Sequence, residues 1–127
     1  MKKIDINKSM EGKTVFLVPT GNNVNRRVGK DVFEQVVEAK IVKAARVNVT
    51  FQIAGVYEPK VYRQQNNDLN LIVSTGDCNA GYNVFLTKED VVDERIRVGV
   101  LRKIRDGHLD MNAAQAKAIA EIMCWEL

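Results

Sequence analysis

A short polar segment near the start of the chain carries the clearest chemistry. Gly21-Asn22-Asn23-Val24-Asn25-Arg26-Arg27 places three amides beside two guanidinium groups. A guanidinium offers a planar fork of donors to phosphate oxygens, and an asparagine amide can hydrogen-bond a base edge. The segment therefore predicts a site for a ligand that carries phosphate and base groups. The alternative interpretation is a polar hairpin loop whose arginines lie in solvent.

Further cations and aromatic rings follow after residue 80. Arg95 and Arg102, and less closely Arg105, share one face of a predicted helix, which could bind an anion. Solvated pairing with neighbouring acidic residues is the alternative. Tyr82 and Phe85 lie three positions apart on a predicted strand, hence on opposite faces. One ring can therefore pack in the core while the other stacks on a ligand, and Phe85 is the better core candidate.

The groups that most catalytic mechanisms need are missing. His108 is the only histidine, and the neighbouring carboxylates Glu89 and Asp90 fall in the first turn of a predicted helix, where negative charge complements the helix dipole. Neither phosphate-binding glycine motif, GxxxxGK[ST] or GxGxxG, is present. Cys78 and Cys124 stand far apart without a CxxC pair, so we expect neither a disulfide nor a zinc site. We therefore expect no catalytic residue, no metal, no cofactor and no enzyme activity.

Size and charge bound the remaining classes. The chain has 127 residues, of which 46% are apolar and 28% are charged, as expected for one globular domain over residues 1–127. No apolar run approaches the ~18 residues of a membrane span, and the first residues lack a secretory core. We therefore expect a soluble cytoplasmic protein with no membrane partner. A net charge of +3 fits a compact anion better than a nucleic-acid duplex.

The elements that must position these residues change character near residue 87. Residues 13–86 alternate β-branched positions with Gly, Asn and Asp clusters, which predicts strands and turns without an intervening helix. The predicted strands cover residues 14–18, 32–45, 47–54, 58–64, 69–74 and 82–86, with the first stopped by Pro19. Val47, Val49, Phe51 and Ile53 should share one core face. This pattern favours an antiparallel meander that closes into a small barrel.

Residues 87–127 predict two helices, which makes the fold class α+β. Thr87 can cap the first, which should end at Asp106-Gly107. Val92, Ile96, Val100 and Ile104 recur every four residues, so this helix can lie on the barrel. Asp110 can cap the second helix, predicted from Met111 to about Cys124. Its alanines suit close approach to another helix, either its neighbour or that of a second subunit.

Three short motifs flanking the β-rich middle carry a family resemblance. GKTVxLxPTGNNxxR spans Gly12 to Arg26, a GYxxFxTxED-like stretch spans Gly81 to Asp90, and IAEI spans Ile119 to Ile122. In this order they resemble the phage Thoeris anti-defence sponges of the first type. Proteins of that family sequester cyclic ADP-ribose isomers made by bacterial immune sensors without cleaving them, and some also take up cyclic trinucleotides in separate pockets. They assemble as hexamers with pockets between subunits.

The resemblance implies two sets of ligand contacts. For a cyclic trinucleotide, it points to Asn22, Asn23, Arg26, Arg27 and Thr87. For a cyclic ADP-ribose isomer, it points to Tyr82 or Phe85 for base stacking, Asn83 for hydrogen bonding, and Arg95, Arg102 and Arg105 for the pyrophosphate. No arginine follows Arg105, so a family contact made by an arginine of the terminal helix is missing or replaced.

Two main hypotheses of function remain. The first is a phage anti-defence sponge, a homo-oligomer, expected as a hexamer, that sequesters a cyclic nucleotide messenger in the host cytoplasm without cleaving it. The second is a small β-barrel adaptor for RNA or DNA, against which stand the modest charge and an aromatic content of only 6%. A third, a cyclic-nucleotide phosphodiesterase, would usually need a metal cluster or paired histidines.

Overall fold

The computed structural model describes residues 4–65, 70–77, 79–106 and 112–125. The chain divides into two compact units, Met1–Arg95 and Ile96–Leu127, and the helix that begins near residue 87 crosses this division. The barrel therefore keeps the first turns of that helix within its own unit. The prediction that residues 1–127 form a single domain stays a prediction.

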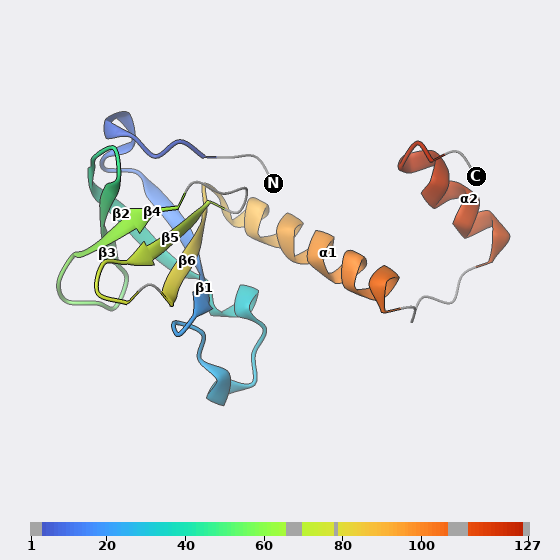
Figure 1. Cartoon of the computed structure of the whole chain (residues 1–127), viewed down its shortest axis with the longest axis horizontal. Coiled ribbons are helices and arrows are strands. Elements are labelled where there is room, and N and C mark those ends of the chain that lie inside the picture. Colours follow the sequence, from blue (N-terminus) through green and yellow to red (C-terminus); the bar gives the residue numbers. More distant parts are fainter. Residues whose placement is uncertain (1–3, 66–69, 78, 107–111, 126–127) are drawn as a thin grey trace. The chain divides into compact units, whose positions relative to one another are not determined.

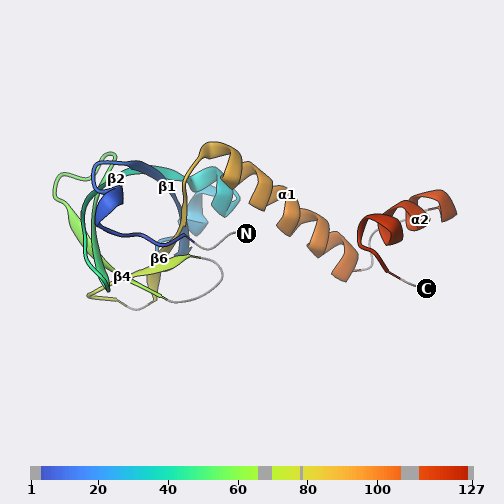
Figure 2. The same ribbon diagram turned by 90° about the horizontal axis from the view of Figure 1, so that it is seen from above.

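The first unit is built around a closed six-stranded antiparallel barrel (Figure 1). Each strand pairs with the next along the chain, and the last pairs back with the first, so that the strands form the ring seen from above in Figure 2. The strands are β1 (Thr14–Gly21), β2 (Val37–Ala44), β3 (Asn48–Ile53), β4 (Lys60–Gln64), β5 (Leu71–Ser74) and β6 (Ala80–Phe85). The α+β class and the meander closing into a barrel are confirmed.

The inside of the barrel is filled by alternate strand residues. Val49, Phe51 and Ile53 of β3 are buried together, as their spacing predicts. Val47 precedes β3 and is half exposed, so its predicted place on the same core face is wrong. The ring of Tyr62 packs edge-on against Phe51, with centroids 5.9 Å apart. Packing of this apolar interior keeps the strands, and with them the ends from which the loops project, in place.

Pro19 does not end the first strand, contrary to the expectation from the sequence. The reason is its position in the sheet. β2 pairs with β1 only from Thr14 to Leu17, whereas β6 pairs with it as far as Gly21. Pro19 therefore lies where β1 is paired with β6 but not with β2. Its missing N–H removes no hydrogen bond to β2, since none is formed there. The strand extends to Gly21, so Asn22 follows it directly.

Short 3-10 helices replace the start of the predicted second strand. Residues Val32–Gln35 form η3 instead of extended chain, because the side chain of Asp31 accepts a hydrogen bond from the backbone N–H of Phe33 at 2.9 Å. Two more 3-10 helices, Lys8–Met10 and Arg26–Val28, occur among the described residues. None of the three crosses over between parallel strands. The predicted fifth strand begins at Leu71 in the structure, and Leu69 lies outside the described residues.

A second, smaller core covers the outer side of β1 and β6. Phe85, Val18 and Val91 are buried there, with Phe33 packed against them. The placement of Phe85 in a core is confirmed. Arg95 forms an ion pair with Glu34 of η3 at 2.8 Å, within the same unit. This cluster fixes the first turns of the helix to the barrel.

The helices are α1 (Lys88–Arg105) and α2 (Ala113–Ile122). The hydroxyl of Thr87 accepts a hydrogen bond from the backbone N–H of Asp90, as expected of a cap. The cap of α2 is Asn112, which exchanges hydrogen bonds with Gln115, and not Asp110, which lies outside the described residues together with Met111. The helix therefore begins later than predicted. None of the described helices is both long and apolar enough to cross a membrane.

The apolar stripe of α1 is exposed, and the expectation that this helix lies on the barrel stays a prediction. Val92, Ile96, Val100 and Ile104 are 42–59% exposed. The buried residues of α1 are Val91 and Glu94, both in its first turns. No described residue from 96 to 125 is buried. The second unit thus presents its apolar side chains to solvent.

The buried phenol of Tyr62 predicts a loss of stability at high pH. Burial, and then the neighbouring phenol of Tyr82, raise the pKa of Tyr62 to about 12. A tyrosine in the unfolded chain ionises near pH 10. The neutral ring therefore stabilises the fold below pH 10, and this contribution disappears as the pH rises towards 12. In urea unfolding series at pH 9 to 12, Tyr62→Phe should lose less stability than the wild type; parallel curves would contradict this.

Candidate functional site

The polar segment predicted to bind a ligand forms a hollow. Its lining residues enclose about 420 Å³ and are Gly21, Asn22, Val24, Asn25, Arg26 and Arg27. Arg26 and Arg27 begin the 3-10 helix η2 (Arg26–Val28), and the side chain of Asn25 accepts a hydrogen bond from the N–H of Arg27 at 3.1 Å. This local cap places both arginines on one turn. Both are exposed.

The start of this loop is fixed to the turn that precedes β6. The backbone N–H of Asn22 donates to the carbonyl of Asn79 at 2.8 Å, and its side-chain Nδ2 donates to Asp77 Oδ2 at 3.0 Å. Asn23 Nδ2 donates to the carbonyl of Gly81 at 3.0 Å. Both asparagines therefore use an amide group for positioning, and each keeps its side-chain oxygen as an acceptor.

The end of the loop is held by one glutamine. Gln35 Oε1 accepts from the N–H of Asn25 at 2.9 Å, while its Nε2 donates to the carbonyls of Asn25 and Lys30 at 3.2 and 3.0 Å. One side chain thus replaces the backbone partners that an irregular loop lacks. Sequence reasoning missed Gln35, since nothing in its local context distinguishes it from a surface residue.

The charges around the hollow favour an anion. Among the described residues that line it there is no carboxylate. Over the described ranges, neither guanidinium of Arg26 and Arg27 has an ion-pair or hydrogen-bond partner. Asp77 stands beside the loop, and the hydrogen bonds from Asn22 Nδ2 and then from the N–H of Asn79 lower the pKa of its carboxyl. It stays ionised and committed to those two donors.

Thr87 is not part of this hollow. Its hydroxyl accepts from the N–H of Asp90 at 3.1 Å and thereby caps α1. The structure therefore brings together Asn22, Arg26 and Arg27, with Asn23 adjacent, and gives Thr87 a helix-capping role.

The arginines predicted on the helix separate into two environments. Arg102 and Arg105 line a hollow of about 370 Å³ with Val98 and Leu101, on one face of α1. Arg105 also contacts the exposed carboxylate of Asp106 at 3.3 Å. Arg95 is absent from this lining and is paired with Glu34 in the first unit. Of the three arginines, only Arg102 and Arg105 line a common hollow.

Tyr82, Asn83 and Phe85 belong to the barrel unit. Phe85 is only 2% exposed, so its ring is not available for stacking in this arrangement. Tyr82 is half-buried and packs edge-on against Tyr62, with centroids 5.8 Å apart. The Oδ1 atom of Asn83 is buried and has no hydrogen-bond partner among the described residues. The two rings lie on opposite faces of β6, as predicted, but both are packed against protein.

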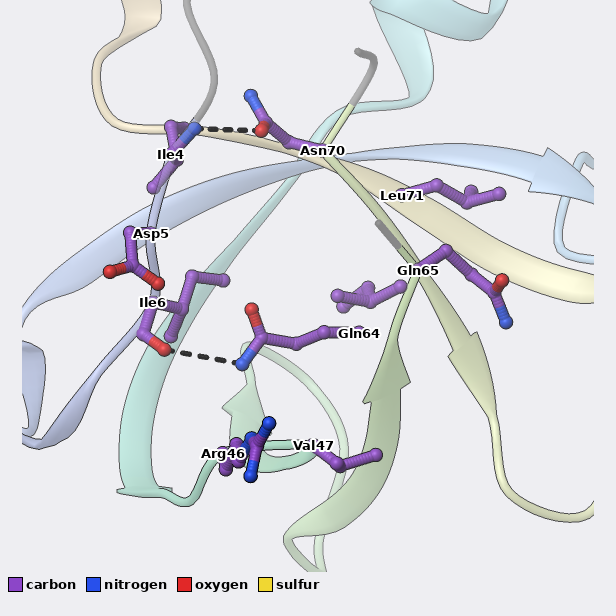
Figure 3. Close-up of a pocket in the computed structure, with 10 residues that line it drawn as sticks. Ile4, Asp5, Ile6, Arg46, Val47, Gln64, Gln65, Asn70 and Leu71 are labelled. Carbon is purple, nitrogen blue, oxygen red and sulfur yellow. Dashed lines mark hydrogen bonds between the residues drawn. The ribbon is translucent and has the colours of Figure 1, made fainter. Parts of the chain in front are cut away.

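A further hollow lies at one end of the barrel and was not predicted (Figure 3). The segment Ile4–Ile6 crosses this end: the N–H of Ile4 donates to Asn70 Oδ1 at 2.7 Å, and Gln64 Nε2 donates to the carbonyl of Ile6 at 3.2 Å. The hollow encloses about 320 Å³, and its charged lining residues are Arg46 and Asp5. Its mixed charge makes it a weaker anion site than the loop hollow. Its walls come from four separate segments, which no local pattern could connect.

Fold and site together define a small closed antiparallel β-barrel that carries a cationic loop and is followed by a helical unit. The chain belongs to the family described as the phage ProQ C-terminal-like domain, whose sequence profile matches residues 1–126. Comparisons with curated proteins and with solved structures found no match. The match covers the barrel and the helices alike, so the chain is a member of a phage-associated domain family over nearly its full length.

Proposed function

We propose that this chain captures a cyclic nucleotide signal and sequesters it without cleaving it, as a phage anti-defence protein. The observation that carries the proposal is the loop hollow, in which Arg26 and Arg27 are exposed, unpaired with any described residue, and free of a carboxylate in the lining. Paired guanidinium groups bind phosphate oxygens through charge-assisted hydrogen bonds. The resemblance to the Thoeris anti-defence sponges supports the ligand class, and the match to a phage-associated family supports only the association with phage.

The other lining residues favour a nucleotide over a bare phosphate. Asn22 in the lining, and Asn23 next to it in the chain, each retain a side-chain oxygen that can accept from the exocyclic amine of a base. Val24 adds an apolar surface for a ribose or base. At about 420 Å³, the hollow suits one phosphate and its nucleoside, so a cyclic trinucleotide would extend beyond it. A second chain could contribute the rest of such a site.

Binding without cleavage fits the chemistry of the lining. Arginine stays protonated at neutral pH, and asparagine is neither a base nor a strong nucleophile. Asp77 is the nearby acidic group that the hydrogen bonds connect to the loop, and its lowered pKa makes it a poor general base. The loop hollow can therefore hold a phosphodiester but offers no group that would activate water.

Assembly into a homo-oligomer is part of the proposal. Val92, Ile96, Val100 and Ile104 form an exposed apolar stripe on α1, and Ile122, Met123 and Trp125 are exposed near the end of α2. Contiguous exposed apolar surface of this kind is typical of protein interfaces. We propose that a second copy of the chain covers this surface, because the family resemblance implies hexamers. In addition, no described residue from 96 to 125 is buried within the single chain.

A nucleic-acid adaptor is the second candidate. Lys40, Lys43 and Arg63 lie on the outer face of the barrel, where the register places Lys43 beside Thr50 and Arg63 beside Asn48. Such a face could contact a phosphate backbone. Among the described residues of the barrel unit, Tyr57, in the loop between β3 and β4, is the one exposed aromatic ring on which a base could stack. Glu38 shares the outer face of β2 with Lys40 and places a negative charge there.

Capture followed by heat release separates the candidates. The protein is incubated with a cyclic trinucleotide or a cyclic ADP-ribose isomer, freed of unbound ligand and denatured, and the released material is identified by mass spectrometry. A sponge returns the intact ligand, an enzyme returns products, and a nucleic-acid adaptor retains neither. Native mass spectrometry of the same complexes gives the number of subunits and ligands.

A further inference from the structure

Two turns that are far apart in the sequence are joined beside the loop hollow that Arg26 and Arg27 line. Asp77 Oδ2 accepts from Asn22 Nδ2 at 3.0 Å, and Asp77 Oδ1 accepts from the N–H of Asn79 at 3.0 Å. The N–H of Asn22 in turn donates to the carbonyl of Asn79 at 2.8 Å. Three hydrogen bonds thus connect Asn22, Asp77 and Asn79 in a closed circuit.

The backbones of the two turns are also in close contact. Gly21 has a φ of +54°, and a Cβ atom at this position would lie 1.9 Å from the carbonyl oxygen of Asn79. Any side chain at position 21 would therefore collide with backbone. The absence of a Cβ allows Asn22 to come within reach of Asp77.

The joined turns fix the start of the loop that carries the two arginines. Asn22 lies at the start of this loop and lines the same hollow as Arg26 and Arg27. Gln35 holds the loop at Asn25 through two hydrogen bonds. Asp77 fixes its start, Gln35 fixes its end, and the two guanidinium groups project from the turn between them.

We propose that Asp77 is a positioning residue for this hollow: it holds Asn22, and through Asn22 the loop, in the geometry in which Arg26 and Arg27 bind phosphate together. This inference rests on the proposed function. The positioning role also gives a reason for the presence of the Asp77 carboxylate beside an anion site, although its negative charge opposes the binding of an anion. Positioning and electrostatics therefore predict opposite effects when this carboxylate is removed.

The test compares Asp77→Ala with Glu58→Ala in calorimetric titrations with cyclic tri-adenosine monophosphate. Glu58 is a control for charge because it is exposed, bears the same charge and lies between β3 and β4, away in sequence from the loop and from the residues that hold it. Asp77→Ala should weaken binding about five- to thirtyfold, less than the loss of a whole charge-assisted phosphate contact, because both guanidinium groups remain. Glu58→Ala should leave binding unchanged or slightly tighter.

A thermodynamic cycle shows whether Asp77 acts through the arginines. In the Arg26→Ala/Arg27→Ala background, Asp77→Ala should have no further effect, because the groups that it positions are gone. An equal loss in both backgrounds would overturn the positioning role, as would tighter binding by Asp77→Ala. If the wild type does not bind but folds, the proposed function fails, and this role fails with it. Melting temperatures of all variants identify any loss due to unfolding.

Discussion

Arg26→Ala together with Arg27→Ala should weaken capture of a cyclic trinucleotide about ten- to a hundredfold while the barrel stays folded. The loss of one charge-assisted contact to a phosphate, at roughly 1.5–3 kcal/mol, already accounts for this range, because 1.4 kcal/mol corresponds to about a factor of ten in affinity. Both side chains are exposed and neither is part of the apolar core, so little stability should be lost. Isothermal titration calorimetry gives the affinity, and thermal unfolding checks the fold.

The matched control is Arg46→Ala together with Arg63→Ala. These arginines are also exposed on the barrel unit, lie outside the loop hollow, and change the net charge by the same amount. A similar loss in the control would show that only overall charge attracts the ligand. Unchanged affinity in the Arg26/Arg27 variant would mean that the loop is a solvated turn.

The same variant distinguishes between one site and two. Arg102 and Arg105 line their own hollow on α1, so capture of a cyclic ADP-ribose isomer should depend on them and only slightly on Arg26 and Arg27. Arg102→Ala together with Arg105→Ala should show the reverse pattern. Equal losses for both ligands in either variant would merge the two proposed sites into one.

Ile96→Glu together with Val100→Glu should break the proposed assembly. Both side chains are more than half exposed within the apolar stripe of α1, so the change leaves the single chain almost unaffected. If two copies bury the stripe against each other, the two substitutions change four side chains in the symmetric interface. At about 1 kcal/mol per side chain, the loss of about 4 kcal/mol corresponds to a roughly thousandfold rise in the dissociation constant. Sedimentation velocity at micromolar concentration should show an oligomer for the wild type and a monomer for the variant.

Lys13→Glu provides the control for charge. It lowers the net charge by the same two units on an exposed residue of the barrel unit. The substituted Val100 also projects away from Arg102 of the α1 hollow, because residues two positions apart on a helix point about 160° apart at 100° per residue. A monomeric wild type, or an unchanged oligomer in the Ile96/Val100 variant, would contradict assembly through this stripe.

Local patterns were sufficient for the elements but not for their partners. Alternation predicted the strands because most of them bury only the face toward the barrel interior, β1 and β6 being the exceptions. Four-residue spacing predicted α1. The same spacing does not say what covers Ile96 and Val100, since any apolar surface can. Pro19 was read as a strand end because the sequence does not tell which part of β1 has a neighbour on both sides.

The candidate site divides in the same way. Asn22, Arg26 and Arg27 were recognised because the groups that suit phosphate are contiguous in the chain. Asp77 and Gln35 were not, because their importance comes from contacts across 55 and 10 positions, respectively. Thr87 and Phe85 were drawn into the site by resemblance, whereas the structure uses one as a helix cap and the other as core. Contacts of this kind depend on the register of the closed barrel, which no short motif encodes.

Closure of the ring by β1 and β6 also bears on how much of this protein a cell can accumulate. A binder that acts by stoichiometric capture must reach at least the concentration of its ligand, a condition that catalysts escape. Open sheets at high concentration tend to add strands from neighbouring chains along their free edges. Here every strand of the ring pairs with a strand on each side, and the stretch of β1 without a β2 partner holds a buried proline that cannot donate a hydrogen bond. The barrel is therefore suited to abundance without edge-to-edge aggregation.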